Sequence, residues 1–134
     1  MAYWRLYYHI VWTTKERKSL ISTSIEEKLH RYIINKSKEF NCTVHIVNSM
    51  PDHVHLIVSI PPKIAISEYV RKIKDSSSNY IGKTDNDSFY WQDGYGIFSV
   101  GVQNLHIAIN YVKNQKQHHQ NKTTITELEI IEAE

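Results

Sequence analysis

Regular alternation of apolar and polar positions predicts three β-strands in the first half of the chain. Positions 3–13 alternate between an apolar series and a second series that contains His9. The same period of two runs through 42–48 and 53–60, and two residues is the spacing at which side chains return to one face of a strand. Because only positions 49–52 separate the second and third strands, we expect these two to form a hairpin.

Apolar residues recur at helical spacing in three further stretches. The first runs from Ser24 to Phe40 and opens with Ser-Ile-Glu-Glu, which is typical of a capping box at a helix N-terminus. The second covers about 64–81 and is expected to stop at Gly82. The third covers about 104–118. Its inward face follows the i, i+3, i+4, i+7 rule and contains Leu105, Ala108, Ile109 and Val112.

The order of these elements predicts the fold. Short strands are expected around the glycines of 89–99, so the first six elements form the split βαβ pattern of a ferredoxin-like α+β sandwich with an antiparallel sheet. The third helix is an addition to that pattern. The first strand and the strand at 53–60 should be central neighbours, so His9 is expected to flank any site on the latter. A length of 134 residues suits a single domain, with 120–134 as a C-terminal tail.

Two histidines one residue apart suggest a metal site. His53 and His55 should project from the same face of their strand, because side chains alternate along it. Neutral imidazole is a common ligand of divalent metals. A His-X-His pair on a strand is also compatible with histidines that bind nothing, so the pair alone does not decide between the two interpretations.

Charge adds a second candidate surface. The net charge is only +2, with eight histidines left neutral, so overall charge does not establish an anionic partner. Arg71, Lys72 and Lys74 cluster on the second predicted helix and continue into a serine-rich stretch, which suits contacts with sugar and phosphate. An ordinary solvated face explains the same cluster equally well.

Cysteine usage and hydropathy exclude several classes of protein. Cys42 is the only cysteine, which excludes an intrachain disulfide and a cysteine-rich zinc site. No apolar run is long enough to span a bilayer, and the N-terminus has no signal-peptide pattern. We therefore expect a cytoplasmic location and no membrane partner.

Four blocks occur along the chain in a defined order: YHIVWTTK at 8–15, PDHVHL at 51–56, WQDGYGIFSV at 91–100 and YVKNQ at 111–115. Together they resemble the single-tyrosine transposases of the 200/605 insertion-sequence family, which carry a His-hydrophobic-His (HUH) motif. The resemblance implies an enzyme that cuts and rejoins single-stranded DNA at transposon ends. It also implies a homodimer, hairpins near the DNA ends, and a bacterial or archaeal protein associated with the nucleoid.

The family pattern also implies roles for particular residues. Tyr111 would be the nucleophile, carried by the added C-terminal helix, and His53, His55 and Gln115 would bind Mg²⁺ or Mn²⁺. The resemblance suggests a site shared between subunits, in which Tyr111 of one chain serves the histidine pair of the other. Glycines in 94–101 would permit such a crossing. A helix folded back on its own sheet is the alternative.

Three other functions remain open on the sequence. A domesticated relative would process chromosomal hairpin repeats rather than move an element, and the DNA around its gene would lack paired hairpin ends. A non-catalytic nucleic-acid-binding module would bind DNA without metal-dependent cleavage. A metal-dependent hydrolase would cut DNA without forming a covalent adduct.

Overall fold

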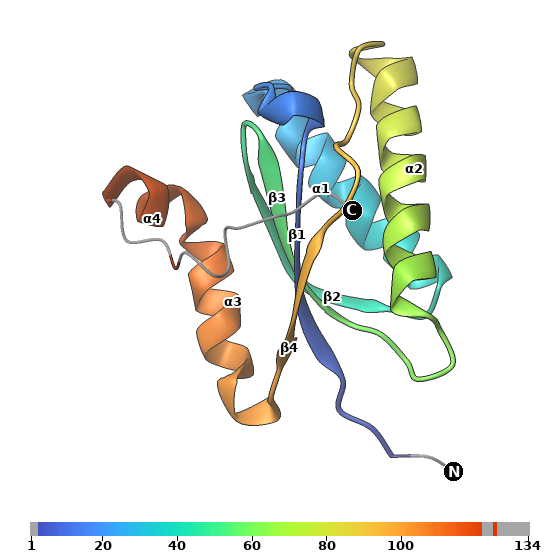
Figure 1. Ribbon diagram of the computed structural model, residues 1–134, viewed down its shortest axis with the longest axis vertical. Coiled ribbons are helices and arrows are strands. Elements are labelled where there is room, and N and C mark those ends of the chain that lie inside the picture. The colour runs from blue at the N-terminus through green and yellow to red at the C-terminus, as the bar shows by residue number, and fades with distance from the viewer. Residues whose placement is uncertain (1–2, 122–124, 126–134) are drawn as a thin grey trace.

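The computed structural model describes residues 3–121 and residue 125, so the predicted tail at 120–134 lies almost wholly outside the described residues. Figure 1 shows the elements, which follow one another in this order. They are β1 (Tyr7–Thr13), the 3-10 helix η1 (Lys15–Arg17), α1 (Thr23–Glu39), β2 (Thr43–Met50), β3 (His53–Ser59), α2 (Ile66–Thr84), β4 (Gly96–Val100), the 3-10 helix η2 (Val102–Asn104), α3 (Leu105–Lys113) and α4 (Gln115–Asn121).

The strands form one sheet in the order β2-β3-β1-β4, and each neighbouring pair is antiparallel. Helices α1 and α2 cover one face of this sheet, and α3 packs on the other face (Figure 1). The arrangement confirms the predicted ferredoxin-like α+β sandwich with an added C-terminal helical segment. As expected, β1 and β3 are the central strands. In the described part of the chain, no helix is both long and apolar enough to cross a membrane.

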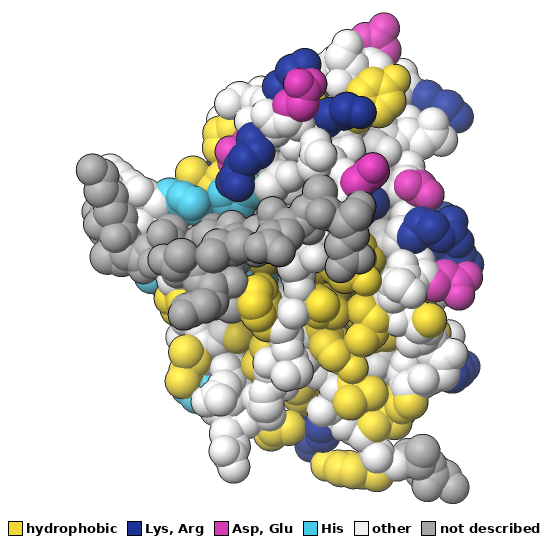
Figure 2. All heavy atoms as spheres, in the orientation of Figure 1, with side chains coloured by type: hydrophobic (Ala, Val, Ile, Leu, Met, Phe, Trp, Pro, Cys, Tyr) yellow, Lys and Arg dark blue, Asp and Glu magenta, His cyan; other side chains and the backbone are white. Residues whose placement is uncertain are grey.

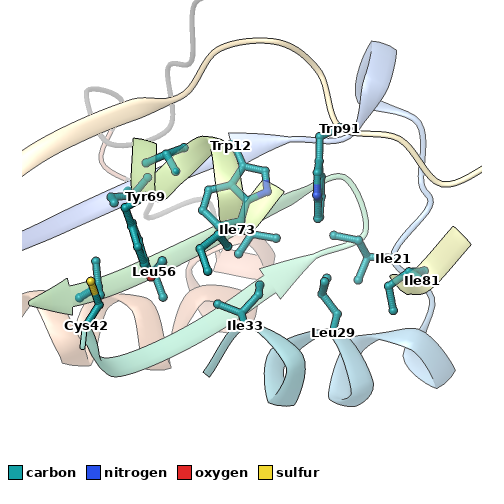
Figure 3. Packing of buried hydrophobic residues seen from close by; sticks show 14 of the residues in the cluster. Trp12, Ile21, Leu29, Ile33, Cys42, Leu56, Tyr69, Ile73, Ile81 and Trp91 are labelled. Carbon is teal, nitrogen blue, oxygen red and sulfur yellow. The ribbon is translucent and has the colours of Figure 1, made fainter. Parts of the chain in front are cut away.

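The hydrophobic core lies between the sheet and the pair α1 and α2. Trp12 of β1 and Leu56 of β3 meet Leu29 and Ile33 of α1 and Ile73 of α2 in one buried cluster (Figure 3). Full burial of such a side chain contributes roughly 1.5–3 kcal/mol. Because side chains alternate along a strand, this packing also directs the intervening side chains of β1 and β3 to the opposite face of the sheet.

The hairpin between β2 and β3 is tighter than predicted. The strands pair as far as Met50 opposite His53, so the connection is the two-residue turn Pro51-Asp52 rather than the predicted four residues. The backbone N–H of Thr14, just after β1, donates to the Asp52 carbonyl at 2.9 Å. The end of β1 therefore holds the turn that precedes the histidine pair.

The predicted boundaries of three other elements also change. β1 begins at Tyr7, four residues later than predicted, and the first helix begins at Thr23 with Ser22 at its N-cap. The predicted capping box at Ser24 is wrong, because Ser24 lies inside the helix and no side-chain capping bond is formed. α2 continues through Gly82 to Thr84 instead of stopping there.

Lys74 of α2 has a structural role. Its ammonium donates to the carbonyl oxygens of Gln92 and Gly94, both at 2.7 Å, and so fastens the loop before β4 to α2. Gly94 has φ 90°, the left-handed region that glycine adopts readily. Burial lowers the pKa of Lys74, and the Asp93 and Asp75 charges oppose this effect.

We expect Lys74→Met to lower the free energy of unfolding by about 1–3 kcal/mol, because hydrogen bonds to a charged group are worth roughly that much. Arg71→Met is the matched control on the same helix, and should change stability by less than about 0.5 kcal/mol, as exposed substitutions usually do. Urea denaturation followed by circular dichroism measures both. Equal stabilities of the two variants would contradict the structural role of Lys74.

Candidate active site

The second face of β3 carries His53, His55 and Ile57, and α3 covers it. Ile57 packs with Tyr111 and Val112 in a small apolar cluster on this side of the sheet. The two histidines are 2% and 0% exposed. Buried polar groups in native proteins are nearly always hydrogen-bonded, so the partners of these imidazoles determine which nitrogen each can offer to a ligand.

Asp52, in the turn before β3, orients the ring of His53. Its Oδ1 lies 2.7 Å from His53 Nδ1, and since a carboxylate only accepts, Nδ1 is the donor. Its Oδ2 accepts from Arg17 Nε at 3.3 Å. Burial raises the pKa of Asp52, but the hydrogen bond from His53 and the Arg17 charge outweigh burial and hold that pKa below its usual value. In the neutral form of the His53 ring, this bond places the lone pair on Nε2.

His9 of β1 makes the corresponding contact with His55. His9 Nε2 lies 2.8 Å from His55 Nδ1, so one of these nitrogens donates and the other accepts. Val11 is the direct partner of His55 across the ladder, which makes His9 its diagonal neighbour on the same face, within reach of a ring side chain. When His55 Nδ1 is the donor, its lone pair also lies on Nε2. Such outer partners commonly fix the tautomer of a metal-binding histidine.

Tyr111 of α3 lies beside these imidazoles and is only 7% exposed. Its ring centroid is 6.2 Å from that of His9 and 6.1 Å from that of His55. The His118 ring stacks on it, with centroids 4.7 Å apart. Its Oη accepts a hydrogen bond from the backbone N–H of Ile125 at 3.0 Å.

The predicted single helix at 104–118 is interrupted, which corrects that prediction. Asn114 leaves helical geometry with φ −97° and ψ 21°, and α4 begins at the next residue. That residue, Gln115, is fully buried although both of its neighbours are exposed. Residues four apart share a helix face, so His119 follows Gln115 on the same side of α4.

Polar contacts from β2 hold α4 in place. Asn48 Nδ2 donates to the last two carbonyls of α3 at 2.9 and 3.2 Å, and thereby satisfies groups that a helix end leaves unpaired. Lys116 Nζ donates to Glu26 Oε2 at 2.9 Å and to Asn48 Oδ1 and the Ser49 carbonyl at 3.1 Å each. The start of α4 is therefore tied to both α1 and β2.

The histidines of this site fit a divalent metal ion. His53, His55 and His119 bring one ring nitrogen each to within 4.8 Å of one another. Nitrogens bound to one ion at roughly 2.1 Å lie at most about 4.2 Å apart. Rotation of the side chains would therefore bring the three ring nitrogens within bonding distance of one cation. Because imidazoles are neutral, they leave the charge of a divalent ion available to an anionic ligand such as phosphate.

The predicted residues thus fall into two groups. The structure brings Tyr111 and the histidine pair together and places Gln115 on the buried side of α4, whereas α2 carries Arg71, Lys72 and Lys74 on the opposite face of the sheet. Arg71 lies 3.8 Å from the Asp75 carboxylate, and Lys72 lies 3.2 Å from that of Glu68. Basic and acidic side chains are interspersed on the α2 side of the molecule (Figure 2).

The structure forms the candidate site within one chain. Tyr111 faces His9 and His55 of its own sheet because Val112 and the apolar residues of α3 pack on Ile46 and Ile57. The expected arrangement, in which Tyr111 serves the histidines of a second subunit, concerns a dimer and stays a prediction.

Sequence reasoning did not predict the contacts that three residues make at the site. It gave His9 only a flanking position, because a hydrogen bond between two histidines depends on strand register. It gave His119 no role, although the spacing of four from Gln115 was a usable signal. Asp52 is predicted only as part of the connection at 49–52, whereas its carboxylate links His53 to Arg17.

We expect acid to loosen α4 from the sheet. Burial raises the pKa of Glu26, but hydrogen bonds from Lys116 and Ser49 and the Lys116 charge outweigh burial and hold that pKa below its ordinary value of 4.5. The stabilisation is therefore complete above pH 4.5 and is lost as the pH falls through the lowered native pKa. Hydrogen exchange measures it as falling protection factors for α4 amides.

Lys116→Met should reduce the protection of α4 at neutral pH and remove most of its acid dependence, because the cation that lowers the Glu26 pKa is gone. Lys113→Met, at an exposed position of α3, is the matched control and should behave like the wild type. Identical α4 protection in wild type and Lys116→Met across the pH range would show that this ion pair does not hold the helix.

Comparison with known proteins places the chain among transposases. The family model described as "Transposase IS200 like" matches residues 2–115. The ISDra2 transposase TnpA of Deinococcus radiodurans is 29% identical over 75 residues, which cover 56% of this chain and 54% of the relative. The transposase of insertion sequence element IS200 from Salmonella typhimurium is 24% identical over 119 residues, or 84% of this chain and 78% of that protein. The match thus spans about half the length of the first relative.

Solved structures share the fold. A candidate transposase from Deinococcus radiodurans superposes with a TM-score of 0.70 at 20% identity, covering 86% of this chain and 95% of the other. A REP-associated tyrosine transposase, solved bound to a REP hairpin, superposes with a TM-score of 0.66 at 18% identity, covering 89% of this chain and 74% of the other. Since the family model covers most of the sequence, the chain belongs to the IS200-like transposase family.

Proposed function

We propose that this protein is a single-strand DNA transposase that cuts and rejoins DNA at transposon ends, with Tyr111 as its nucleophile. The observation that carries the proposal is the position of Tyr111, whose nearly buried ring lies about 6 Å from the rings of His9 and His55 of the same chain. In the described part of the structure, the Tyr111 ring lies against the ring of His55 on β3.

The reaction is a transesterification. The Oη of Tyr111 forms a bond to phosphorus while the bond from phosphorus to the 3′ oxygen breaks, leaving a 5′-phosphotyrosine and a 3′ hydroxyl. The phenol loses one proton and the departing 3′ oxygen gains one, so the step is balanced through solvent. One phosphoester replaces another, and rejoining therefore needs no nucleotide cofactor.

The residues around Tyr111 address the main barrier to this chemistry. A phenol with a pKa of about 10 is ionised in roughly one molecule in a thousand at neutral pH. We propose that His53, His55 and Gln115 hold a divalent metal ion, Mg²⁺ or Mn²⁺ by the resemblance. Such an ion, when bound, would polarise the scissile phosphate and offset the charge that develops on its oxygens. Asp52 and His9 would orient the two imidazoles through their Nδ1 atoms.

The DNA substrate extends beyond the site. We propose that the protein works as a homodimer on single-stranded DNA whose ends carry hairpins, in line with the hairpin bound by the REP-associated structural relative. Arg71 and Lys72 of α2 are the candidate contacts with backbone phosphate, because their charged groups pair with exposed carboxylates that a phosphate could replace. The sequence places Lys74 in the same cluster, but its ammonium already donates to two loop carbonyls.

A second candidate function has its own support. A domesticated relative that processes chromosomal hairpin repeats would use the same fold and chemistry, and one structural relative is a REP-associated transposase. The two functions differ in the DNA that flanks the gene. Cleavage only of paired hairpin ends favours transposition, whereas cleavage at dispersed repeats favours the second function.

We expect Tyr111→Phe to fold and bind hairpin DNA but to form no covalent adduct with labelled single-stranded DNA, since the ring packing remains and only the attacking oxygen is lost. Tyr3→Phe, at a highly exposed position, is the matched control and should form adduct like the wild type. Denaturing gel electrophoresis separates the adduct from free DNA. Undiminished adduct in Tyr111→Phe would refute the assignment of the nucleophile, and cleavage by the wild type without any adduct would indicate a hydrolase.

Replacing Arg71 and Lys72 with alanine should weaken DNA binding irrespective of sequence. The slope of log affinity against log salt should flatten by about 0.7 for each single-strand phosphate contact that is lost. Replacing Arg31 and Lys38, both at exposed positions of α1, with alanine is the control with the same loss of charge. If the double variant and the control have the same salt slope as the wild type, the DNA backbone does not cross α2.

A further inference from the structure

Three imidazoles at the candidate site could bind the same metal ion, one more than the proposed ligand set contains. The third belongs to His119, whose ring centroid lies 5.0 Å from that of His53 and whose ligand nitrogen is within 4.8 Å of those of His53 and His55. This residue lies beyond 2–115, the part of the chain that matches the family model. Its presence at the site is therefore a feature of this chain that the family match does not describe.

The position of His119 follows from the way α4 is anchored. The interruption at Asn114 ends α3, and Lys116 then ties the start of α4 to Glu26 and Asn48. With Gln115 buried against the sheet, a spacing of four residues brings His119 to the same side of the helix. The contacts that place Gln115 thus also place His119, and no separate movement is needed to bring it near β3.

The chemistry of the donor set indicates which metal it prefers. Imidazole suits Zn²⁺, Co²⁺, Ni²⁺ and Fe²⁺, whereas Mg²⁺ favours carboxylate, carbonyl and water oxygens and keeps much of its hydration shell. A set of three imidazoles and one amide is mainly nitrogen and carries no charge. Affinity of such a set rises along the series from Mn²⁺ through Co²⁺ to Cu²⁺ and falls again at Zn²⁺.

We propose that His119 is a metal ligand together with His53 and His55, and that the site binds a transition-metal ion in preference to Mg²⁺. This inference rests on the proposed function, because it concerns the metal of the same site. It changes the expected cofactor from Mg²⁺ or Mn²⁺ to an ion of the series from Mn²⁺ to Zn²⁺. It also makes α4 part of the metal site, so that one short helix supplies both His119 and Gln115.

The test uses binding of Co²⁺ to the metal-stripped full chain, without DNA and without an activity assay. Visible absorption of Co²⁺ reports the number and kind of its ligands. Loss of a residue that merely orients a metal ligand lowers metal affinity by roughly 10- to 100-fold. In His119→Ala the affinity for Co²⁺ should therefore fall by at least this much, and the absorption bands should change. His106→Ala, at an exposed position of α3, should leave affinity and spectrum unchanged.

His119→Phe is a second variant that keeps a ring at this position, in case the alanine variant fails to fold. Circular dichroism shows whether each variant is folded. A variant that is folded and retains the wild-type affinity and spectrum would refute the role of His119. Displacement of Co²⁺ by an equal concentration of Mg²⁺ would refute the metal preference. If the wild type binds none of Co²⁺, Mn²⁺ and Mg²⁺, the metal of the proposed function is refuted as well. If the wild type binds metal and the His119 variants bind it equally well, only the role of His119 is refuted.

Discussion

The burial of β3 on both faces is the constraint on which the rest of this structure depends. On one face, Leu56 and its apolar neighbours close the core with α1 and α2. On the other, His53 and His55 lie under α3 and are out of contact with bulk water. Burying an imidazole without a partner is costly, so the fold must supply hydrogen bonds at that depth. It does so through Asp52 in the preceding turn and His9 on the neighbouring strand.

The same contacts that satisfy the buried imidazoles also prepare them for chemistry. Occupying Nδ1 of His53 leaves its lone pair on Nε2, and the bond between His9 and His55 allows the equivalent tautomer there. The geometry is held by strand register and by a two-residue turn. A site built in this way loses little order when a ligand binds, which favours affinity.

The helical segment after β4 is held differently. α3 is attached through a small apolar cluster, whereas α4 depends on polar contacts of Asn48 and Lys116 that respond to pH and to single substitutions. Tyr111, the proposed nucleophile, and His119 of α4 are therefore held in place by contacts of different kinds. On the far side of the sheet, Lys74 shows that a basic residue near a proposed DNA surface can serve the fold instead.

The sequence by itself determined the alternation of β1 and β3, the order of elements and hence the ferredoxin-like sandwich, because period and order are local properties of the chain. It also placed His53 and His55 on one strand face, and its resemblance to known transposases pointed to Tyr111 and Gln115. Only the tertiary structure decided the pairing of His9 with His55, the interruption at Asn114 and the approach of His119, since each depends on contacts between distant residues. The same reason explains Lys74: its partners are loop carbonyls, and nothing in the side-chain pattern of a helix reveals where a backbone carbonyl from another segment will lie.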